Sequence, residues 1–96
     1  MDIEAGSFTW DEVKEAGNIL KHGVDFATAS KVFFDENRKI YKDFKHSREE
    51  DRLFCVGKAG NRIITVRFTY RGHKVRIIGA GFWRKGRKRY HEKENE

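Results

Sequence analysis

The chain has 96 residues, a net charge of +6 and one cysteine. This length leaves room for one domain with a modest core, which we expect to span residues 1–96. No apolar run reaches the roughly 18 residues that a membrane-spanning helix needs, and no secretory signal is recognisable, so we expect a cytoplasmic protein. The lone Cys55 lies in an apolar, strand-like run and is expected to be a buried hydrophobic side chain rather than a nucleophile.

The charges are distributed unevenly along the chain. Residues 1–37 hold three Lys/Arg and eight Asp/Glu, whereas residues 38–96 hold 18 and 7. This split predicts a domain with a basic side. A basic surface attracts nucleic acid through its phosphates, with an affinity that falls as salt rises. An acidic protein partner would fit the same surface, and the two kinds of partner are compatible.

The N-terminal third predicts two helices. Residues 1–7 have no hydrophobic period and are expected to form a loose leader. Thr9 and Glu12 fit a capping box for a first helix, which would end at Gly23 because glycine tolerates the left-handed conformation. The predicted buried stripe of this helix consists of Trp10, Val13, Gly17 and Leu20, with Ile19 beside it. Asp25 can cap a second helix, whose inward residues would be Phe26, Ala29, Val32 and Phe33.

The first predicted helix also carries a polar stripe. Lys14, Asn18 and Lys21 are spaced by four and three residues, so they share one helix face. Two ammonium groups and an amide on one face suit a phosphate or a carboxylate-rich partner. A solvated helix face is the simpler alternative.

From residue 39 the hydrophobic period becomes two, which predicts four strands, at Lys39–Phe44, Arg52–Lys58, Arg62–Tyr70 and Lys74–Ala80. Short turns join the last three, so these should be antiparallel neighbours. In the third strand Ile64, Val66 and Phe68 share one face, and Arg67 and Arg71 share the other. The end of the chain, from Phe82 to about Lys93, predicts a basic helix that Gly86 weakens. We therefore expect an α+β fold with two N-terminal helices, a four-stranded antiparallel sheet and a C-terminal helix.

A set of residues in a fixed order extends over most of the chain. Its members are Trp10, Asp11, Lys14, Asn18, Lys21, His22, Gly23, Phe26, Ala29, Val32, Phe33, Asp35, Asp43, His46, Glu49, Arg52, Gly57, Thr69, Arg71, Arg76, Ile77, Ile78, Ala80, Arg87 and Tyr90. This set resembles the BrnT toxins of type II toxin–antitoxin pairs, which are relatives of the RelE/ParE ribonuclease fold. The resemblance extends from Phe8 to about Glu92.

The resemblance implies a RelE-like ribonuclease that inhibits translation and growth and needs no metal or other cofactor. Such enzymes direct the ribose 2′-hydroxyl onto the neighbouring phosphate, which restricts the reaction to RNA. The implied partner is a ribbon-helix-helix antitoxin, through which alone the toxin would meet DNA. The four histidines at 22, 46, 73 and 91 are too scattered to predict a zinc site, so we expect no metal.

Candidate site residues follow from the resemblance and from the charge pattern. Those proposed for catalysis are Arg76, Arg71, Tyr90, His46 and Glu49. Those proposed for RNA binding are Lys21, His22, Arg67, Arg84, Lys85 and Arg87. Each has a structural alternative: Arg76 pairing with an acidic residue, Tyr90 anchoring the last helix, His22 capping its helix, or His46, Glu49 and Arg52 clamping a loop.

The chain departs from the family pattern near its C-terminal end. Gly79-Ala80-Gly81 stands where the family usually has Ser-Ala-Arg, and Gly86 replaces a common glutamate. Loss of one cation aimed at a transition state typically costs about 10²–10³ in rate. Arg67, Arg84 and Lys85 are candidate substitutes. The alternatives to an active toxin are a weakened or silent member that acts through antitoxin binding and operon autoregulation, and a plain basic nucleic-acid-binding module.

Overall fold

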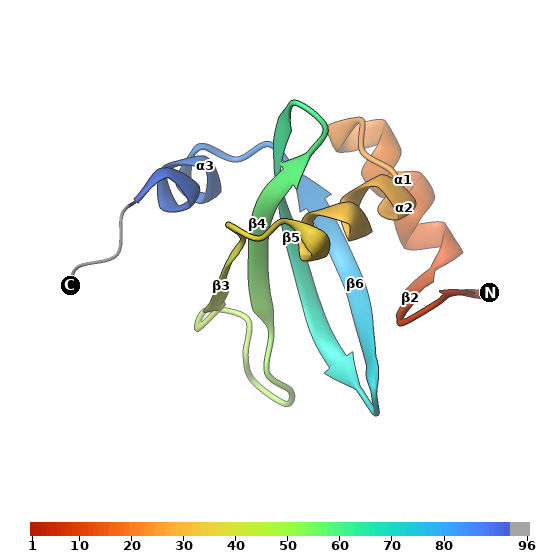
Figure 1. Ribbon diagram of the computed structural model, residues 1–96. Coiled ribbons are helices and arrows are strands. Elements are labelled where there is room, and N and C mark those ends of the chain that lie inside the picture. Colours follow the sequence, from red (N-terminus) through yellow and green to blue (C-terminus); the bar gives the residue numbers. More distant parts are fainter. Residues whose placement is uncertain (93–96) are drawn as a thin grey trace.

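The computed structural model describes residues 1–92, in which one mixed sheet is combined with three α-helices and a short 3-10 helix (Figure 1). The strands are β1 (Asp2–Ala5), β2 (Phe8–Asp11), β3 (Lys39–Lys42), β4 (Leu53–Ala59), β5 (Arg62–Arg71) and β6 (Lys74–Gly81). The helices are α1 (Glu12–His22), α2 (Phe26–Ser30), the 3-10 helix η1 (Lys31–Phe34) and α3 (Arg84–His91). The strand order is β1-β2-β6-β5-β4-β3. Only β2 and β6 are parallel neighbours in this sheet.

The expectation of a four-stranded antiparallel sheet and a loose leader is wrong. Residues 2–5 form β1, which pairs with β2, and β2 pairs with β6 from Phe8↔Val75 to Trp10↔Ile77. The sequence Phe-Thr-Trp has high strand propensity, and a parallel partner more than 60 residues away along the chain (Phe8 with Val75) is not visible in a local pattern.

Helix α1 consequently starts later than the capping box predicted. Asp11 is the N-cap, and its carboxylate accepts a hydrogen bond from Lys14 N at 2.9 Å. Gly23 ends the helix with φ 70°, as predicted, and donates its N–H to Ile19 O. The predicted buried stripe is wrong, because Val13 and Leu20 are 73% and 88% exposed. The second predicted helix is divided into α2 and η1.

The inner face of the sheet is covered by α2 and η1, which cross in front of it in Figure 1. The core cluster includes Phe26, Ala29 and Val32 from these helices, and Ile64, Val66 and Phe68 from β5. Gly57 lets η1 approach closely, since a β-carbon there would lie 2.8 Å from Val32 O. Cys55 is buried as predicted, and burial raises the pKa of its thiol to about 12, so the thiolate is scarce at neutral pH.

The outer face of the sheet receives α3. Thr65 points away from Ile64 and Val66, and a β-carbon on Gly86 would overlap Thr65 Oγ1. Gly86 therefore permits close packing of α3 on β5, although it lowers helix propensity. The predicted C-terminal helix exists, but its expected end at residue 93 lies outside the described residues. Across residues 1–92, no helix is long and apolar enough to span a membrane.

Helix α1 lies along the edge of β6 beyond the end of β2. Asn18 is buried there, and its amide replaces a neighbouring strand. Asn18 Nδ2 donates to Ala80 O at 2.9 Å and to Val24 O at 2.9 Å, while Asn18 Oδ1 accepts from Ala80 N at 3.1 Å. These bonds satisfy backbone groups that the short strand β2 leaves unpaired. They also hold Lys14 and Lys21 of the same helix beside the outer face of the sheet.

Candidate functional site

A groove on the outer face of the sheet contains most of the predicted site residues. It consists of three adjoining cavities, and we call it the outer groove. The first cavity, about 540 Å³, is lined by Lys45, His46, Arg48, Glu49, Glu50 and Arg52. The second, about 300 Å³, is lined by Asp11, Lys14, Glu50, Arg52, Arg71, Arg76, Ile77 and Ile78. The third, about 240 Å³, is lined by Lys14, Gly17, Asn18, Lys21, His22, Arg67, Ile78, Gly79 and Trp83.

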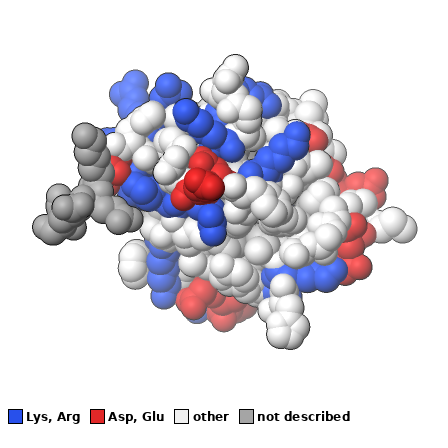
Figure 2. Space-filling model, viewed as in Figure 1, with Lys and Arg blue, Asp and Glu red and all other residues white. Residues whose placement is uncertain are grey.

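The three cavities adjoin one another, because neighbouring ones share lining residues. Glu50 and Arg52 line both the first and the second cavity, and Lys14 and Ile78 line both the second and the third. Figure 2 shows the face of the molecule that α2 and η1 cover. Several Lys and Arg side chains gather toward α3 on this face, while Asp and Glu side chains lie near the N-terminus, at the centre and along the lower edge.

His46 lies on the loop between β3 and β4 and is oriented by Asp43. The distance from His46 Nδ1 to Asp43 Oδ2 is 2.8 Å, and Asp43 is 5% exposed. An ionised carboxylate only accepts hydrogen bonds, so with Asp43 ionised the Nδ1–H tautomer of His46 donates to it and the Nε2 of that neutral ring is an acceptor. Asp43 is held in turn by its backbone, which donates to Arg52 O and accepts from the Ser47 hydroxyl. This pair has the arrangement of an oriented general base.

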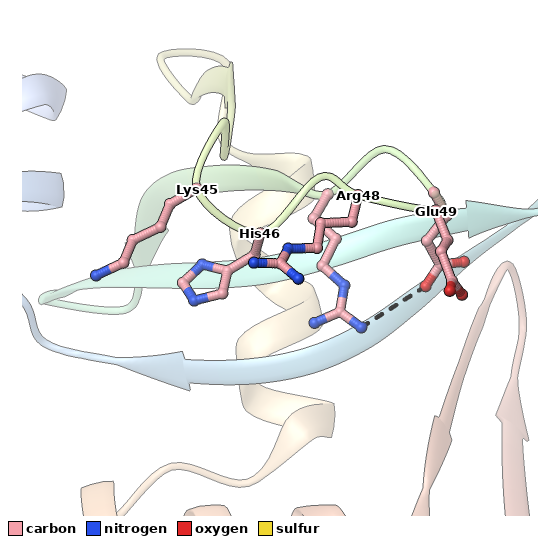
Figure 3. A pocket seen from close by; sticks show the side chains of 6 residues that line it. Lys45, His46, Arg48 and Glu49 are labelled. Carbon is pink, nitrogen blue, oxygen red and sulfur yellow. Dashed lines mark ion pairs between the residues drawn. The ribbon is translucent and has the colours of Figure 1, made fainter.

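The rest of the first cavity is charged and open. Lys45, His46, Arg48 and Glu49 all come from the same loop, and Glu49 lies well apart from His46 (Figure 3). Glu49 is exposed, whereas the neighbouring Glu50 binds two arginines. The distances from Glu50 Oε1 to the Nη2 atoms of Arg52 and Arg71 are 3.9 Å and 3.7 Å. Ion pairs of this length at a partly exposed site are weak, so both guanidinium groups are available to an incoming anion.

Arg76 shares the second cavity with Arg71 but has strong partners. Its Nη2 donates to Asp2 Oδ1 at 2.9 Å and its Nη1 donates to Thr9 Oγ1 at 3.2 Å. The hydrogen bond from Arg76 lowers the pKa of the Asp2 carboxyl. The side chain of Arg76 is only 14% exposed. Arg76 therefore joins β6 to β1 and β2, which is the structural alternative considered for it.

Arg67 projects from the middle of β5 into the third cavity. Its Nε is buried and has no hydrogen-bond partner among the described residues. A buried donor without a partner is unfavourable, so Arg67 is held in this position at some cost in stability. Gly79 lies opposite Arg67 in the sheet register, and a β-carbon there would lie 3.8 Å from Arg67 Nη2. The cavity wall beside Arg67 therefore has no side chain at position 79, where the family resemblance implies a serine.

Lys21 and His22, which were proposed for RNA binding, line the third cavity from the last turn of α1. The His22 ring packs edge-on against Trp83, with ring centroids 5.1 Å apart. Trp83 was not among the predicted site residues. A β-carbon on Gly81 would lie 2.9 Å from the Trp83 ring, so this glycine makes room for the indole. Gly79 therefore lines the third cavity directly, and Gly81 affects it through the position of Trp83.

Tyr90 does not join the other candidates. Its hydroxyl donates to Asp35 Oδ2 at 2.7 Å, and desolvation together with this hydrogen bond raises the pKa of Tyr90 to about 12. Asp35 also accepts from the backbone N–H groups of Asn37 and Lys58. Although desolvation acts in the other direction, these hydrogen bonds lower the pKa of the Asp35 carboxyl. Tyr90 thus connects α3 to η1 and β4, and it does not line the cavity that Arg71 and Arg76 share.

The three basic candidates on α3 are exposed and do not line the outer groove. Lys85 lines a separate cavity of about 400 Å³ that meets the first cavity at Lys45. Arg84 and Arg87 line none of these four cavities. Within residues 1–92, no three His, Cys, Asp or Glu side chains gather as a metal site would require.

The groove combines a histidine that contacts a buried carboxylate with arginines and lysines, which are groups that can bind phosphates. The chain was also compared with known protein families. The family model described as "Ribonuclease toxin, BrnT, of type II toxin-antitoxin system" matches residues 10–87. The chain belongs to the BrnT family, so it is a ribonuclease toxin with RNA as substrate and an antitoxin as partner. None of the curated proteins matches the chain.

Proposed function

We propose that the chain cleaves single-stranded RNA at the first and second cavities without a metal ion. The observation that carries this proposal is the Asp43–His46 pair, placed at the end of a groove lined by cations. His46 Nε2 accepts the proton of a ribose 2′-hydroxyl, and Asp43 stabilises the resulting imidazolium. The 2′-oxygen then attacks the adjacent phosphorus and the bond to the 5′-oxygen breaks. The departing 5′-oxygen takes a proton from water in the open groove.

Arg52 and Arg71 bind the scissile phosphate in this proposal. Both line the second cavity, and Arg52 also lines the first, where His46 lies. Their guanidinium groups offset the negative charge that grows on the phosphate oxygens. Arg76, which lines the second cavity, holds β1 and β2 in place through its hydrogen bonds to Asp2 and Thr9. Tyr90 takes no part, because its proton is held by Asp35. Glu49 has no assigned step, since it lies apart from His46.

The direct test is cleavage of a defined single-stranded RNA by the purified toxin in buffer containing EDTA. The expected products carry a 2′,3′-cyclic phosphate and a 5′-hydroxyl, which end-mapping identifies. Loss of cleavage on chelation would contradict metal independence. Intact RNA with and without added Mg²⁺, from a folded protein, would instead favour the silent family member that acts through antitoxin binding and autoregulation.

We propose that the antitoxin docks on α1. This helix exposes an apolar stripe of Val13, Ala16 and Leu20, and Lys14 and Lys21 of the same helix line the groove beside it. A partner with an apolar segment flanked by carboxylates would cover the stripe and the groove together. The sequence resemblance supports a ribbon-helix-helix antitoxin, a cytoplasmic location and a relation to RelE/ParE toxins. DNA would be contacted only through the antitoxin.

A single substitution on this stripe separates antitoxin binding from catalysis. Leu20→Asp is expected to weaken capture of the antitoxin in co-purification by about tenfold or more, because a carboxylate would be buried in the interface. RNA cleavage should be unchanged, since Leu20 lines none of the three cavities of the groove. Phe44→Asp, at a side chain that is 82% exposed, is the matched control and should keep the antitoxin. If Phe44→Asp loses the antitoxin and Leu20→Asp keeps it, the antitoxin binds at a site other than α1.

A further inference from the structure

The third cavity has one aromatic wall, which is formed by Trp83. This residue lies between β6 and α3 and is 38% exposed. The chain has two tryptophans, and the other, Trp10, is 4% exposed within the core. A large, half-exposed indole inside a charged groove contributes less to the core than Trp10 does. Its position calls for a role in binding.

The Trp83 ring is fixed before any ligand arrives. The Gly81 side of β6 contacts one part of the indole, because a β-carbon on Gly81 would lie 2.9 to 3.1 Å from three ring atoms. The His22 ring meets the indole edge-on at 5.1 Å with an interplanar angle of 67°. A side chain held by a strand and by the end of a helix loses little freedom when a flat ligand stacks on it.

The charges around Trp83 are all of one sign. Lys14, Lys21 and Arg67 line the same cavity, and its lining residues, all within the described part of the chain, include no carboxylate. The guanidinium of Arg67 lies beside Gly79 in the cavity wall, since its Nη2 would be 3.8 Å from a β-carbon at that position. An aromatic platform beside cations that follow a backbone is how proteins bind single-stranded nucleic acid: bases stack on the ring and phosphates contact the cations.

We propose that Trp83 stacks on a nucleobase of the bound RNA, while Arg67 and Lys21 bind the phosphate beside that base. The subsite accepts any base, since each has a face that stacks. It deepens the proposed function and rests on it, because the second cavity joins this subsite to the reaction centre through Lys14 and Ile78. The stacking contact strengthens RNA binding and positions the strand, and it takes no part in breaking the phosphodiester bond.

The test measures binding to a short single-stranded oligonucleotide in which every ribose is 2′-O-methylated, so that it cannot be cleaved. Its binding to the wild-type protein should quench the fluorescence of Trp83. Trp83→Ala is expected to raise Kd about tenfold, and Trp83→Phe about twofold, because phenylalanine keeps a stacking face. Phe82→Ala changes the neighbouring aromatic, which is 48% exposed and stacks on Arg62, and should leave Kd unchanged.

A second oligonucleotide with abasic positions distinguishes stacking from general attraction. The wild-type and Trp83→Ala proteins should bind it equally, since no base remains to stack. If Trp83→Ala weakens the binding of both oligonucleotides equally, or weakens the binding of neither, the proposal is wrong. Preferential binding of an acidic peptide that depends on Trp83 would also overturn it, because the subsite would then belong to a protein partner.

These outcomes are separable from failure of the proposed function. A toxin that binds the uncleavable strand through Trp83 but leaves ordinary RNA intact would retain the subsite and lose the ribonuclease mechanism. If the Trp83→Ala variant cleaves RNA at the normal rate and with unchanged KM, the ribonuclease mechanism stands and the base-stacking subsite is refuted. Circular dichroism of each variant confirms that the fold is intact before either comparison is made.

Discussion

The two ends of the outer groove differ in how their charged groups are held. At the loop end, formed by the first and second cavities, the polar groups are paired with one another: His46 with Asp43, and Arg52 and Arg71 with Glu50. At the tryptophan end, which is the third cavity, Arg67 has a buried Nε without a partner among the described residues. The lining of that end has no carboxylate.

This difference separates two tasks. A general base must point in one direction, and a buried carboxylate that holds its ring achieves this. A cation that binds the backbone phosphates of RNA needs no such fixed direction, and the third cavity has Lys14, Lys21 and Arg67 with no carboxylate among its lining residues. We therefore expect changes at the loop end to lower kcat and changes at the tryptophan end to raise KM. The substitutions below are ordered by the size of their expected effects.

The largest effect is expected from His46→Gln. It removes the proposed general base while keeping a polar side chain, and should lower kcat by about 10²–10³ with little change in KM. Asp43→Asn should lower kcat less, since it disturbs the orientation of His46 without removing it. His73→Gln, in the exposed turn between β5 and β6, is the matched control and should behave as wild type. Kinetics on a fluorogenic single-stranded RNA provides both parameters.

A result in which His46→Gln and His73→Gln are equally active would remove His46 from the mechanism. The loop end would then be a second binding region, and the comparison between the ends would fail. A loss that appears only in KM would have the same consequence.

A smaller effect is expected from Arg67→Ala at the tryptophan end. Loss of one phosphate contact should raise KM about tenfold and reduce the slope of affinity against salt by about one. The value of kcat should hardly change. Arg62→Ala, an exposed residue on the same strand, controls for the lost positive charge. A drop in kcat for Arg67→Ala, with KM constant, would mean that the scissile phosphate lies at this end instead.

The smallest effect on activity is expected from Asp35→Asn, which lies outside both ends. It should lower the free energy of unfolding by about 1–3 kcal/mol, because Asp35 accepts hydrogen bonds from Asn37, Lys58 and Tyr90. The pKa of Asp35 is below its ordinary value of 3.8, so its contribution is present above that pH and is lost as the pH falls through the folded-state pKa. Urea titrations at pH 7 and pH 3 should show the difference between variant and wild type shrinking at pH 3. A constant difference would contradict this role.

Much of the sheet could be predicted, because residues close together in the sequence specify its strands and turns. Alternating residues place β5 with Ile64, Val66 and Phe68 inside and Arg67 outside, and short turns pair it with β4 and β6. The N-terminal strands could not be predicted in this way. Their position depends on β2 pairing with β6 and on Asp2 binding Arg76, and both contacts join residues far apart in the sequence.

The site was predicted in part for the same reason. The arginine-bearing face of β5 follows from alternation, and His46, Arg71 and Arg76 came from the family resemblance. Asp43 and Trp83 were missed as site residues, although Asp43 precedes His46 by three residues, a spacing that lets the side chains meet. Tyr90 was expected beside the arginines, but close packing of Gly86 on Thr65 sets the position of α3, and Tyr90 binds Asp35.

The central claim is that RNA lies along the whole outer groove, from His46 to Trp83. An NMR titration of the labelled toxin with an uncleavable 2′-O-methylated strand tests it most directly. We expect the largest shifts in amides of the β3–β4 loop, of β6 around Ile78 and Gly79, and of α1 around Lys14 and Lys21. Shifts confined to the cavity around Tyr41, Phe44 and Arg89, with the groove amides unchanged, would contradict the claim.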